Sequence, residues 1–185
     1  MKLWLLRHPR PAVPTGLCYG ASDVPIQDDH LAELLESLPP RLPREATLYS
    51  SPLSRCLRLA RALEPLGWGP VSIDERLREM DFGAWEGHQW SALPREQIDA
   101  WRDDLPNYTP PGGEPLRDLA ARGQAFCEAL PTHRDALIVT HAGVIQTLLR
   151  TLRGRPLSGF GATRIEYGQL VVLERRDPGW EVVDG

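Results

Sequence analysis

The chain contains almost no lysine. Lys2 is the only one among 185 residues, so arginine carries nearly all of the positive charge. Arginine suits bidentate recognition of phosphate or carboxylate better than lysine does. The formal net charge is −4, whereas a protein that binds the phosphate backbone of a nucleic acid needs a surplus of basic residues. The charge therefore argues against a nucleic-acid partner.

Cysteine and long apolar runs are also scarce. Cys18, Cys56 and Cys127 are scattered and odd in number, so they define neither a disulfide framework nor a CxxC metal pair. No apolar stretch approaches the ~20 residues of a membrane span, and no signal-peptide pattern precedes the first predicted strand. These absences predict a protein of a reducing, cytoplasmic compartment that has no membrane partner.

Several signatures of other chemistries are missing. No cysteine is followed by five residues and an arginine, and neither a GxxxxGK[ST] loop nor a GxSxG elbow occurs. No HxH or HxxxH spacing supports a metal site, although a set of His8, His141 and carboxylates is an alternative. We therefore predict that the protein needs neither a metal nor another cofactor.

The chain alternates short apolar runs with amphipathic stretches. Strands are predicted at 2–6, 47–50, 71–73 and 136–140, and two or three more from 164 to 183 with a turn at 177–179. Helices are predicted at 31–38, from Ser51-Pro52 to near Gly67, at 115–130 and at 143–153. This order predicts an α/β fold, a three-layer α/β/α sandwich with a mostly parallel central sheet. The length favours one domain, 1–185, with a long functional loop at 9–28 and an irregular insertion or lid at 76–114 that roofs a cleft.

Two histidines directly follow predicted strands. Arg7-His8 comes after the apolar run Leu3-Trp4-Leu5-Leu6, and His141 comes after 136–140. Ligands of α/β sheets bind beyond the carboxyl ends of the strands, so we expect both imidazoles to face one cleft. A lone histidine is more typical of a structural or surface position, but the shared pattern favours a reactive pair. The remaining histidines lack this pattern and are assigned to surface or loop positions: His30, His88 and His133.

Arg55 is a second cationic candidate. It falls in the first turn of the helix after 47–50, where free backbone N–H groups and a guanidinium favour an anion. The alternative is a solvated surface arginine.

Glu79 is the candidate proton donor. It lies among large apolar neighbours, and a carboxyl group against apolar surface tends to keep its proton. The alternative is a salt bridge to Arg76 or Arg78. Residue chemistry alone does not separate Glu79 from the other carboxylates of this stretch, which are Glu75, Asp81 and Glu86.

Five motifs, in this order, resemble those of the histidine phosphatase superfamily, the phosphoglycerate mutase-like group. They are Arg7-His8, Ser51-Pro52-Leu53-Ser54-Arg55, Leu77-Arg78-Glu79 with Phe82-Gly83-Ala84-Trp85-Glu86-Gly87, Pro111-Gly112-Gly113-Glu114, and Thr140-His141-Ala142-Gly143-Val144. The resemblance implies the phosphoglycerate mutase-like fold. Three shorter stretches are most similar to the α-ribazole phosphatase branch: Cys18-Tyr19-Gly20, Asp23-Val24-Pro25 and Gly112-Gly113-Glu114.

The resemblance implies a metal-independent phosphomonoesterase that acts through a phosphohistidine. The implied roles are nucleophile for His8, proton donor and later base for Glu79, and clamp on the phosphoryl oxygens for Arg7, Arg55 and His141. We also predict substrate contacts for Arg10, Tyr19 and Gly20. Positive charge fits this chemistry, because the transition state of phosphoryl transfer carries charge on its equatorial oxygens. The implied substrate is a small phosphorylated metabolite such as α-ribazole 5′-phosphate of cobalamin biosynthesis, and a homodimer is compatible with the family.

The loop after His8 departs from the family pattern Arg-His-Gly-x-Thr, which has an asparagine a few residues on. Pro9 and Pro11 lack a backbone donor and no asparagine follows, so a hydroxyl and an amide expected at the phosphate are missing. Arg10 either compensates or contacts a second anionic group. The alternatives are a phosphatase of broad specificity for sugar phosphates or nucleotides, a phosphate-binding module with weakened catalysis, and a mutase, for which the chain is short.

Overall fold

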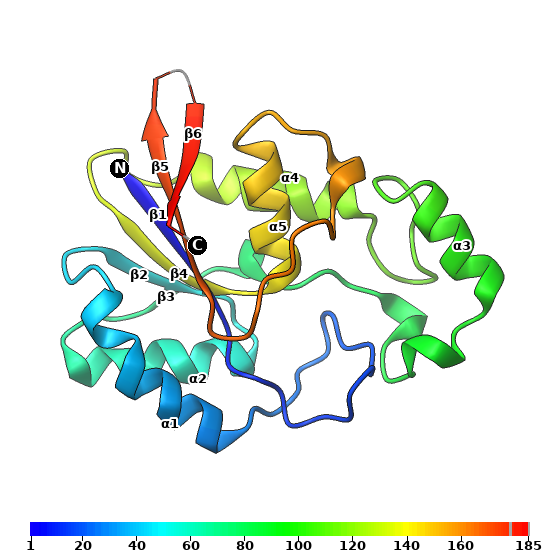
Figure 1. Ribbon diagram of the computed structural model, residues 1–185, viewed down its shortest axis with the longest axis horizontal. Helices are drawn as coiled ribbons and strands as arrows, with labels where there is room; N and C mark the ends of the chain where they lie inside the picture. The colour runs from blue at the N-terminus through cyan, green and yellow to red at the C-terminus, as the bar shows by residue number, and fades with distance from the viewer. Residues whose placement is uncertain (178, 185) are drawn as a thin grey trace.

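A six-stranded sheet in the order β3-β2-β4-β1-β5-β6 forms the centre of the computed structural model, which describes residues 1–177 and 179–184 (Figure 1). The strands are β1 (Lys2–Arg7), β2 (Thr47–Ser50), β3 (Ser72–Ile73), β4 (Ala136–Thr140), β5 (Leu170–Arg176) and β6 (Gly179–Asp184). The first four strands pair in parallel, while β5 is antiparallel to β1 and β6 is antiparallel to β5. The predicted, mostly parallel sheet is confirmed.

Helices cover both faces of this sheet (Figure 1). The helices are α1 (Asp28–Ser37), α2 (Ser54–Leu63), α3 (Arg95–Asp103), α4 (Leu116–Glu128) and α5 (Ala142–Thr151), with short 3-10 turns at Pro39–Arg41, Glu64–Leu66, Glu75–Leu77, Gly83–Trp85, Trp90–Ala92 and Leu157–Gly159. Side chains alternate along a strand, so Leu5 packs with residues of α4 and α5, whereas Leu6 packs with residues of α1 and α2. The result is the predicted three-layer sandwich.

Ser51 does not begin α2, contrary to the sequence prediction. Its N–H donates to the Val139 carbonyl at 3.0 Å, which continues the ladder between β2 and β4 by one residue. The helix begins at Ser54, whose N–H and hydroxyl donate to the Asp23 carboxylate at 2.8 and 2.7 Å. The helix start that we expected to offer free N–H groups to an anion is therefore capped by a carboxylate of the chain itself.

The predicted insertion at 76–114 is more regular than its sequence indicates, because it contains α3. It lies against the 9–28 loop. Leu17 forms an isolated antiparallel β-bridge with Gln89, and the Cys18 N–H donates to the His88 carbonyl at 2.8 Å. Closure of this segment over a substrate stays a prediction, as does the single-domain organisation.

The chain after α5 differs in detail from its prediction. It holds two strands, β5 and β6, and residues 164–169 form a loop instead of a strand. The predicted turn at 177–179 includes Pro178, which lies outside the described residues. Within residues 1–177 and 179–184, no helix is long and apolar enough to cross a membrane.

Candidate active site

His8 and His141 lie next to each other at the carboxyl ends of the parallel strands. They follow β1 and β4, which are parallel neighbours with Arg7 opposite Thr140. The two ring centroids are 5.1 Å apart, and the residues are 2% and 0% exposed. The structure therefore brings together the two histidines that the sequence places behind separate strands.

His8 is held as a neutral imidazole with one free nitrogen. Its Nδ1 lies 2.7 Å from the Pro9 carbonyl oxygen, which only accepts, so Nδ1 carries the proton and Nε2 keeps its lone pair. Burial, and then the charges of Arg55 and Arg7, hold the pKa of His8 well below its usual value. Pro9 lacks an N–H, but its carbonyl still orients the imidazole as a nucleophile requires.

His141 is neutral in the opposite tautomer. Arg55 Nε donates to its Nδ1 at 3.2 Å, so the proton lies on Nε2, which donates to the Ser51 hydroxyl at 2.8 Å. Burial and the neighbouring Arg55 guanidinium lower the pKa of His141 well below its usual value. In the free protein, His141 therefore offers an N–H dipole rather than the positive charge that its clamp role implies.

Arg55 is fully buried, so the surface alternative is wrong. Besides His141, its guanidinium donates to the carbonyls of Ser22 at 2.7 Å and Gly20 at 2.6 Å. Arg55 thus fixes the 20–22 stretch of the long loop against His141. Its direct contact with a phosphoryl group stays a prediction.

Glu79 enters the same site from the segment that precedes α4. Its Oε1 accepts the Met80 N–H at 3.0 Å, and its Oε2 accepts the Gly143 N–H at 3.0 Å. Gly143 lies in the first turn of α5, two residues after His141, so this bond places the carboxylate beside the histidine pair.

The other carboxylates of this segment are engaged elsewhere. The salt-bridge alternative for Glu79 is wrong, because Arg76 pairs with Asp74 and Arg78 pairs with Glu75. Asp81 accepts the Gly83 N–H, and the Glu86 carboxylate accepts N–H groups of Ala21, Ser22 and Phe82. Position alone therefore selects Glu79, which residue chemistry did not.

A cavity of about 260 Å³ opens beside His8 and Glu79. Its lining residues are Arg7, His8, Gly16, Leu17, Tyr19, Gly20, Glu79, Phe82, Trp90 and Tyr167. Of the predicted substrate contacts, Tyr19 and Gly20 line it and Arg10 does not. Arg10 is exposed, and its backbone N–H donates to the ring of His30 at 3.0 Å.

Arg7 lines this cavity. Its Nη1 donates to the Ile165 carbonyl at 2.5 Å, and its guanidinium lies 3.7 Å from the centre of the Tyr167 ring. Its buried Nε has no hydrogen-bond partner among the described residues. Arg7 therefore places a permanent positive charge at the cavity lining.

Tyr167 is a site residue that the sequence analysis missed. Its hydroxyl lies 2.8 Å from the Tyr19 hydroxyl, and its ring lies 5.7 Å from that of His8, between centroids. The sequence pattern predicts site residues after the carboxyl ends of strands, but Tyr167 precedes β5. Because β5 runs antiparallel to β1, its amino end meets the same edge, and only the strand direction could have revealed this.

Phe82 and Trp90 are further site residues from the 76–114 segment. Their rings pack edge to face at 5.2 Å, and Trp90 stacks on Trp101 at 5.7 Å. With Leu17 they form an apolar, largely aromatic wall of the cavity.

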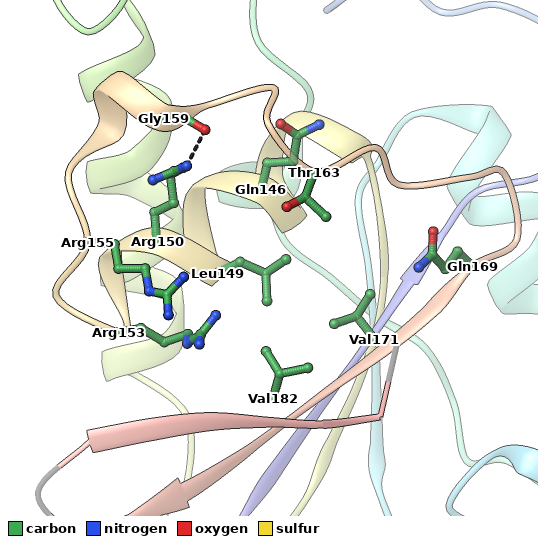
Figure 2. Close-up of a pocket in the computed structure, with 10 residues that line it drawn as sticks. All are labelled: Gln146, Leu149, Arg150, Arg153, Arg155, Gly159, Thr163, Gln169, Val171 and Val182. Atoms are coloured by element: carbon green, nitrogen blue, oxygen red, sulfur yellow. Dashed lines mark hydrogen bonds between the residues drawn. The ribbon is translucent and has the colours of Figure 1, made fainter.

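A second cavity, of about 190 Å³, lies between α5, the following loop and strands β5 and β6 (Figure 2). Three arginines line one side of it, Arg150, Arg153 and Arg155, and the apolar residues Leu149, Val171 and Val182 lie beside them (Figure 2). Its lining contains neither a histidine nor a carboxylate. We therefore place the chemistry in the cavity of His8 and Glu79.

Metal-ligand geometry does not appear in the described part of the chain. No group of three or more histidine, cysteine, aspartate or glutamate side chains there could hold a metal ion. His8 and His141 instead use ring nitrogens to contact Pro9, Arg55 and Ser51. Metal independence itself stays a prediction.

Comparison with known proteins agrees with this geometry. The sequence profile of the histidine phosphatase superfamily (branch 1) matches residues 3–184. The adenosylcobalamin/alpha-ribazole phosphatase of Salmonella typhimurium is 31% identical over 177 residues, covering 91% of this chain and 87% of that protein. The glucosyl-3-phosphoglycerate phosphatase of Mycolicibacterium vanbaalenii is 32% identical over 177 residues, covering 86% and 77%. The crystal structure of the alpha-ribazole phosphatase from Shigella flexneri superposes with a TM-score of 0.85 at 27% identity, covering 98% and 94%.

The chain belongs to the histidine phosphatase superfamily. The resemblance to its α-ribazole phosphatase branch is confirmed as well, because both sequence relatives and structural neighbours carry that name. The relatives named above are phosphatases, which supports a phosphatase activity for this chain.

Proposed function

We propose that the protein is a metal-independent phosphomonoesterase that acts through a phosphohistidine on a small phosphorylated metabolite such as α-ribazole 5′-phosphate. One observation carries this proposal: the cavity is lined at once by a neutral His8 with a free Nε2, by the Glu79 carboxyl group and by the Arg7 guanidinium. These are a nucleophile, a proton donor and a fixed positive charge around a space large enough for a phosphoryl group.

In the first step, His8 Nε2 attacks phosphorus while the bond from phosphorus to the leaving oxygen breaks. Glu79 gives its proton to that oxygen, so the leaving group departs as a neutral alcohol. Arg7 stabilises the charge on the equatorial phosphoryl oxygens. His141 donates from Nε2 to a phosphoryl oxygen once its hydrogen bond to the Ser51 hydroxyl is broken. Arg55 holds the His141 ring in place through Nδ1.

In the second step, water attacks the phosphorus of the phosphohistidine. Glu79, now a carboxylate, takes one proton from that water, and the bond between phosphorus and Nε2 breaks. Inorganic phosphate leaves and His8 returns to its starting form. One carboxyl group serves both steps because it gives a proton in the first and recovers one in the second.

The leaving group of the substrate faces the wall of Leu17, Phe82 and Trp90. Flat aromatic rings stack on such surfaces, so this wall favours a heteroaromatic leaving group over a bare sugar. The sugar-phosphate alternative draws support from the relative named glucosyl-3-phosphoglycerate phosphatase. A panel of phosphomonoesters decides between them: we expect the highest kcat/KM for α-ribazole 5′-phosphate, and a preference for sugar phosphates would reject this substrate.

Two assays separate the enzyme from a binding module with weakened catalysis. Rapid mixing with radiolabelled substrate and quenching in base is expected to trap a phosphoprotein that is stable in base and labile in acid. Turnover is expected to survive dialysis against a chelator. If substrate binds without release of phosphate, or if a divalent ion is needed to restore activity, the proposal is wrong.

A further inference from the structure

Glu79 lies in a segment that no regular element holds. Residues 78–82 are neither helix nor strand, and they connect the short turns Glu75–Leu77 and Gly83–Trp85. General acid catalysis requires the carboxyl group to stay within hydrogen-bond reach of the leaving oxygen. The backbone that carries Glu79 therefore needs an anchor from another element.

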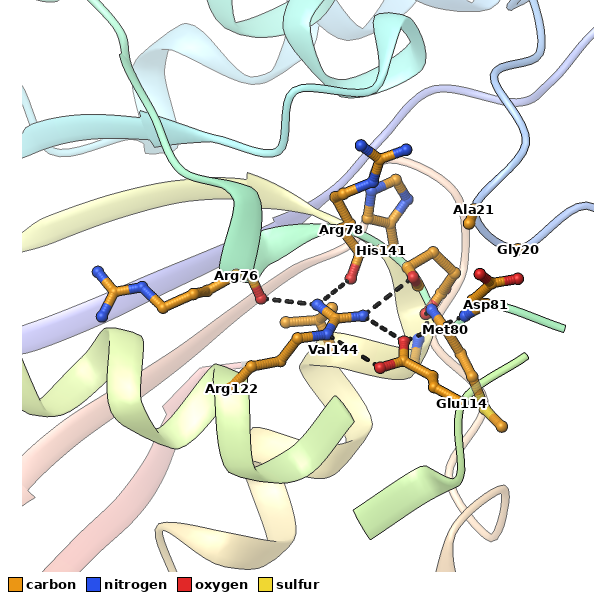
Figure 3. Close-up of polar contacts among 12 residues, drawn as sticks. Gly20, Ala21, Arg76, Arg78, Met80, Asp81, Glu114, Arg122, His141 and Val144 are labelled. Carbon is orange, nitrogen blue, oxygen red and sulfur yellow. Dashed lines mark hydrogen bonds and ion pairs between the residues drawn. The ribbon is translucent and has the colours of Figure 1, made fainter. Parts of the chain in front are cut away.

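Arg122 of α4 supplies this anchor (Figure 3). Its Nη1 donates to the carbonyls of Arg76 at 2.7 Å and Arg78 at 2.5 Å, and its Nη2 donates to the carbonyl of Glu79 at 3.0 Å. A single guanidinium thus fixes three carbonyl groups of the segment that ends at Glu79.

Glu114 completes the arrangement. Its Oε1 accepts from Arg122 Nη2 at 2.7 Å, and its Oε2 accepts from Arg122 Nε at 3.3 Å. Glu114 Oε1 also accepts the Asp81 N–H at 3.1 Å, so the segment is held on both sides of Glu79. The Arg122 side chain is only 22% exposed and that of Glu114 only 21%, which limits competition from water.

The count of donors matches the count of acceptors. A guanidinium has five N–H donors in a fixed planar fork, and Arg122 makes five hydrogen bonds with all three of its nitrogens. A lysine has three donors on one flexible tip and cannot reproduce this pattern. The structure therefore calls for arginine at this position by geometry and not only by charge.

We propose that Arg122 and Glu114 are positioning residues for catalysis, which set the place of the Glu79 carboxyl group by fixing its backbone. Neither lines the cavity, so they act through Glu79 and not on the substrate. This inference rests on the proposed role of Glu79 as proton donor.

The test compares two leaving groups. The phenolate of 4-nitrophenyl phosphate leaves without a proton, whereas the alkoxide of an alkyl phosphomonoester needs one. For Arg122→Lys we expect kcat/KM to fall about 10- to 100-fold for the alkyl ester and less than about threefold for the aryl ester, since general acid catalysis contributes 10²–10⁴. Glu114→Gln removes one acceptor. It is expected to lower kcat/KM by a smaller factor, again more for the alkyl ester than for the aryl ester.

Arg117→Lys is the matched control, because Arg117 lies on the same helix and contacts Asn107 and Asp118 outside the cavity. It is expected to leave both rates unchanged. An equal loss on both esters, or no loss, would overturn the inference. If Arg122→Lys fails to fold, Glu114→Gln decides by the same criterion.

Glu79→Gln separates this inference from the proposed function. If Glu79→Gln lowers kcat/KM equally for both esters, Glu79 is not the proton donor and the proposed function is wrong in that role. The parameter kcat/KM is compared because it reports the first step, whereas the later hydrolysis of the phosphohistidine is the same for both esters. If Glu79→Gln loses more kcat/KM for the alkyl ester than for the aryl ester, and neither Arg122→Lys nor Glu114→Gln does so, only the inference fails.

Discussion

The carboxylate of Glu79 fills the space that a side chain on Gly143 would need. A Cβ at Gly143 would lie 2.2 Å from Glu79 Oε1, closer than two such atoms approach in proteins. The backbone at Gly143 is ordinary helix, so the glycine is required here by the carboxylate and not by its own conformation.

We therefore expect Gly143→Ala to affect activity more than stability. The Glu79 carboxylate ends a flexible side chain and is displaced at little cost, whereas alanine itself favours the helix. Hydrolysis of an alkyl phosphomonoester should fall about 10- to 1,000-fold because the proton donor is misplaced. Steady-state kinetics and the thermal unfolding midpoint measure the two effects.

Gly123→Ala on α4 is the control for this substitution. Its Cβ would lie 3.4 Å from Leu148 Cδ2, which is close to an ordinary contact. Activity should be retained. A Gly143→Ala protein with full activity towards the alkyl ester would show that the observed position of Glu79 does not matter for turnover.

His8→Ala should lower kcat by at least about 10³, because removal of a nucleophile costs far more than loss of one hydrogen bond. The variant should also give no acid-labile phosphoprotein after a base quench. His133→Ala, which changes an exposed residue, is expected to behave like the parent protein. A His8 variant that kept a tenth of the parental rate would exclude His8 as the nucleophile.

The two buried histidines should be visible as different neutral tautomers. Burial and the nearby arginines lower the pKa of both rings, so both should remain neutral when the pH falls below the usual value of 6.5. Nitrogen NMR of the imidazole rings should find the proton on Nδ1 of His8 and on Nε2 of His141. Titration of either ring at or above pH 6.5 would contradict the electrostatic account.

The same lowered pKa values make stability depend on pH with a known sign. Above about pH 6.5, both the folded and the unfolded protein hold His8 and His141 neutral. Below it, the unfolded chain takes up protons that the folded protein does not, so the free energy of unfolding falls by up to about 1.4 kcal/mol per pH unit for each histidine.

Urea unfolding between about pH 7 and pH 5 measures this slope. His8→Asn, whose amide can still donate to the Pro9 carbonyl, should reduce the slope by up to about 1.4 kcal/mol per pH unit. His133→Gln should leave it unchanged. An unchanged slope in the His8 variant would mean that His8 titrates alike in the folded and unfolded protein.

The local parts of the fold follow from the sequence. Apolar runs mark β1, β2 and β4, and helical spacing marks α1, α4 and α5, because burial of one face imposes its period on the chain. α3 was missed, because prolines and tryptophans around it mask that period. Ser51 was misassigned to the start of α2 because only its bond to Val139 shows that the strand continues.

The sequence by itself determined the superfamily and the candidates His8, His141, Arg7, Arg55 and Glu79, since short motifs next to strand ends are local features. Only the tertiary structure decided which carboxylate enters the cavity and which tautomer each imidazole adopts. It also showed that Tyr167 lines the cavity and that Arg122 holds the backbone of Glu79. These depend on chain segments far apart in sequence and on the direction of β5. Distances and hydrogen-bond partners between such segments are set by packing, which no local pattern records.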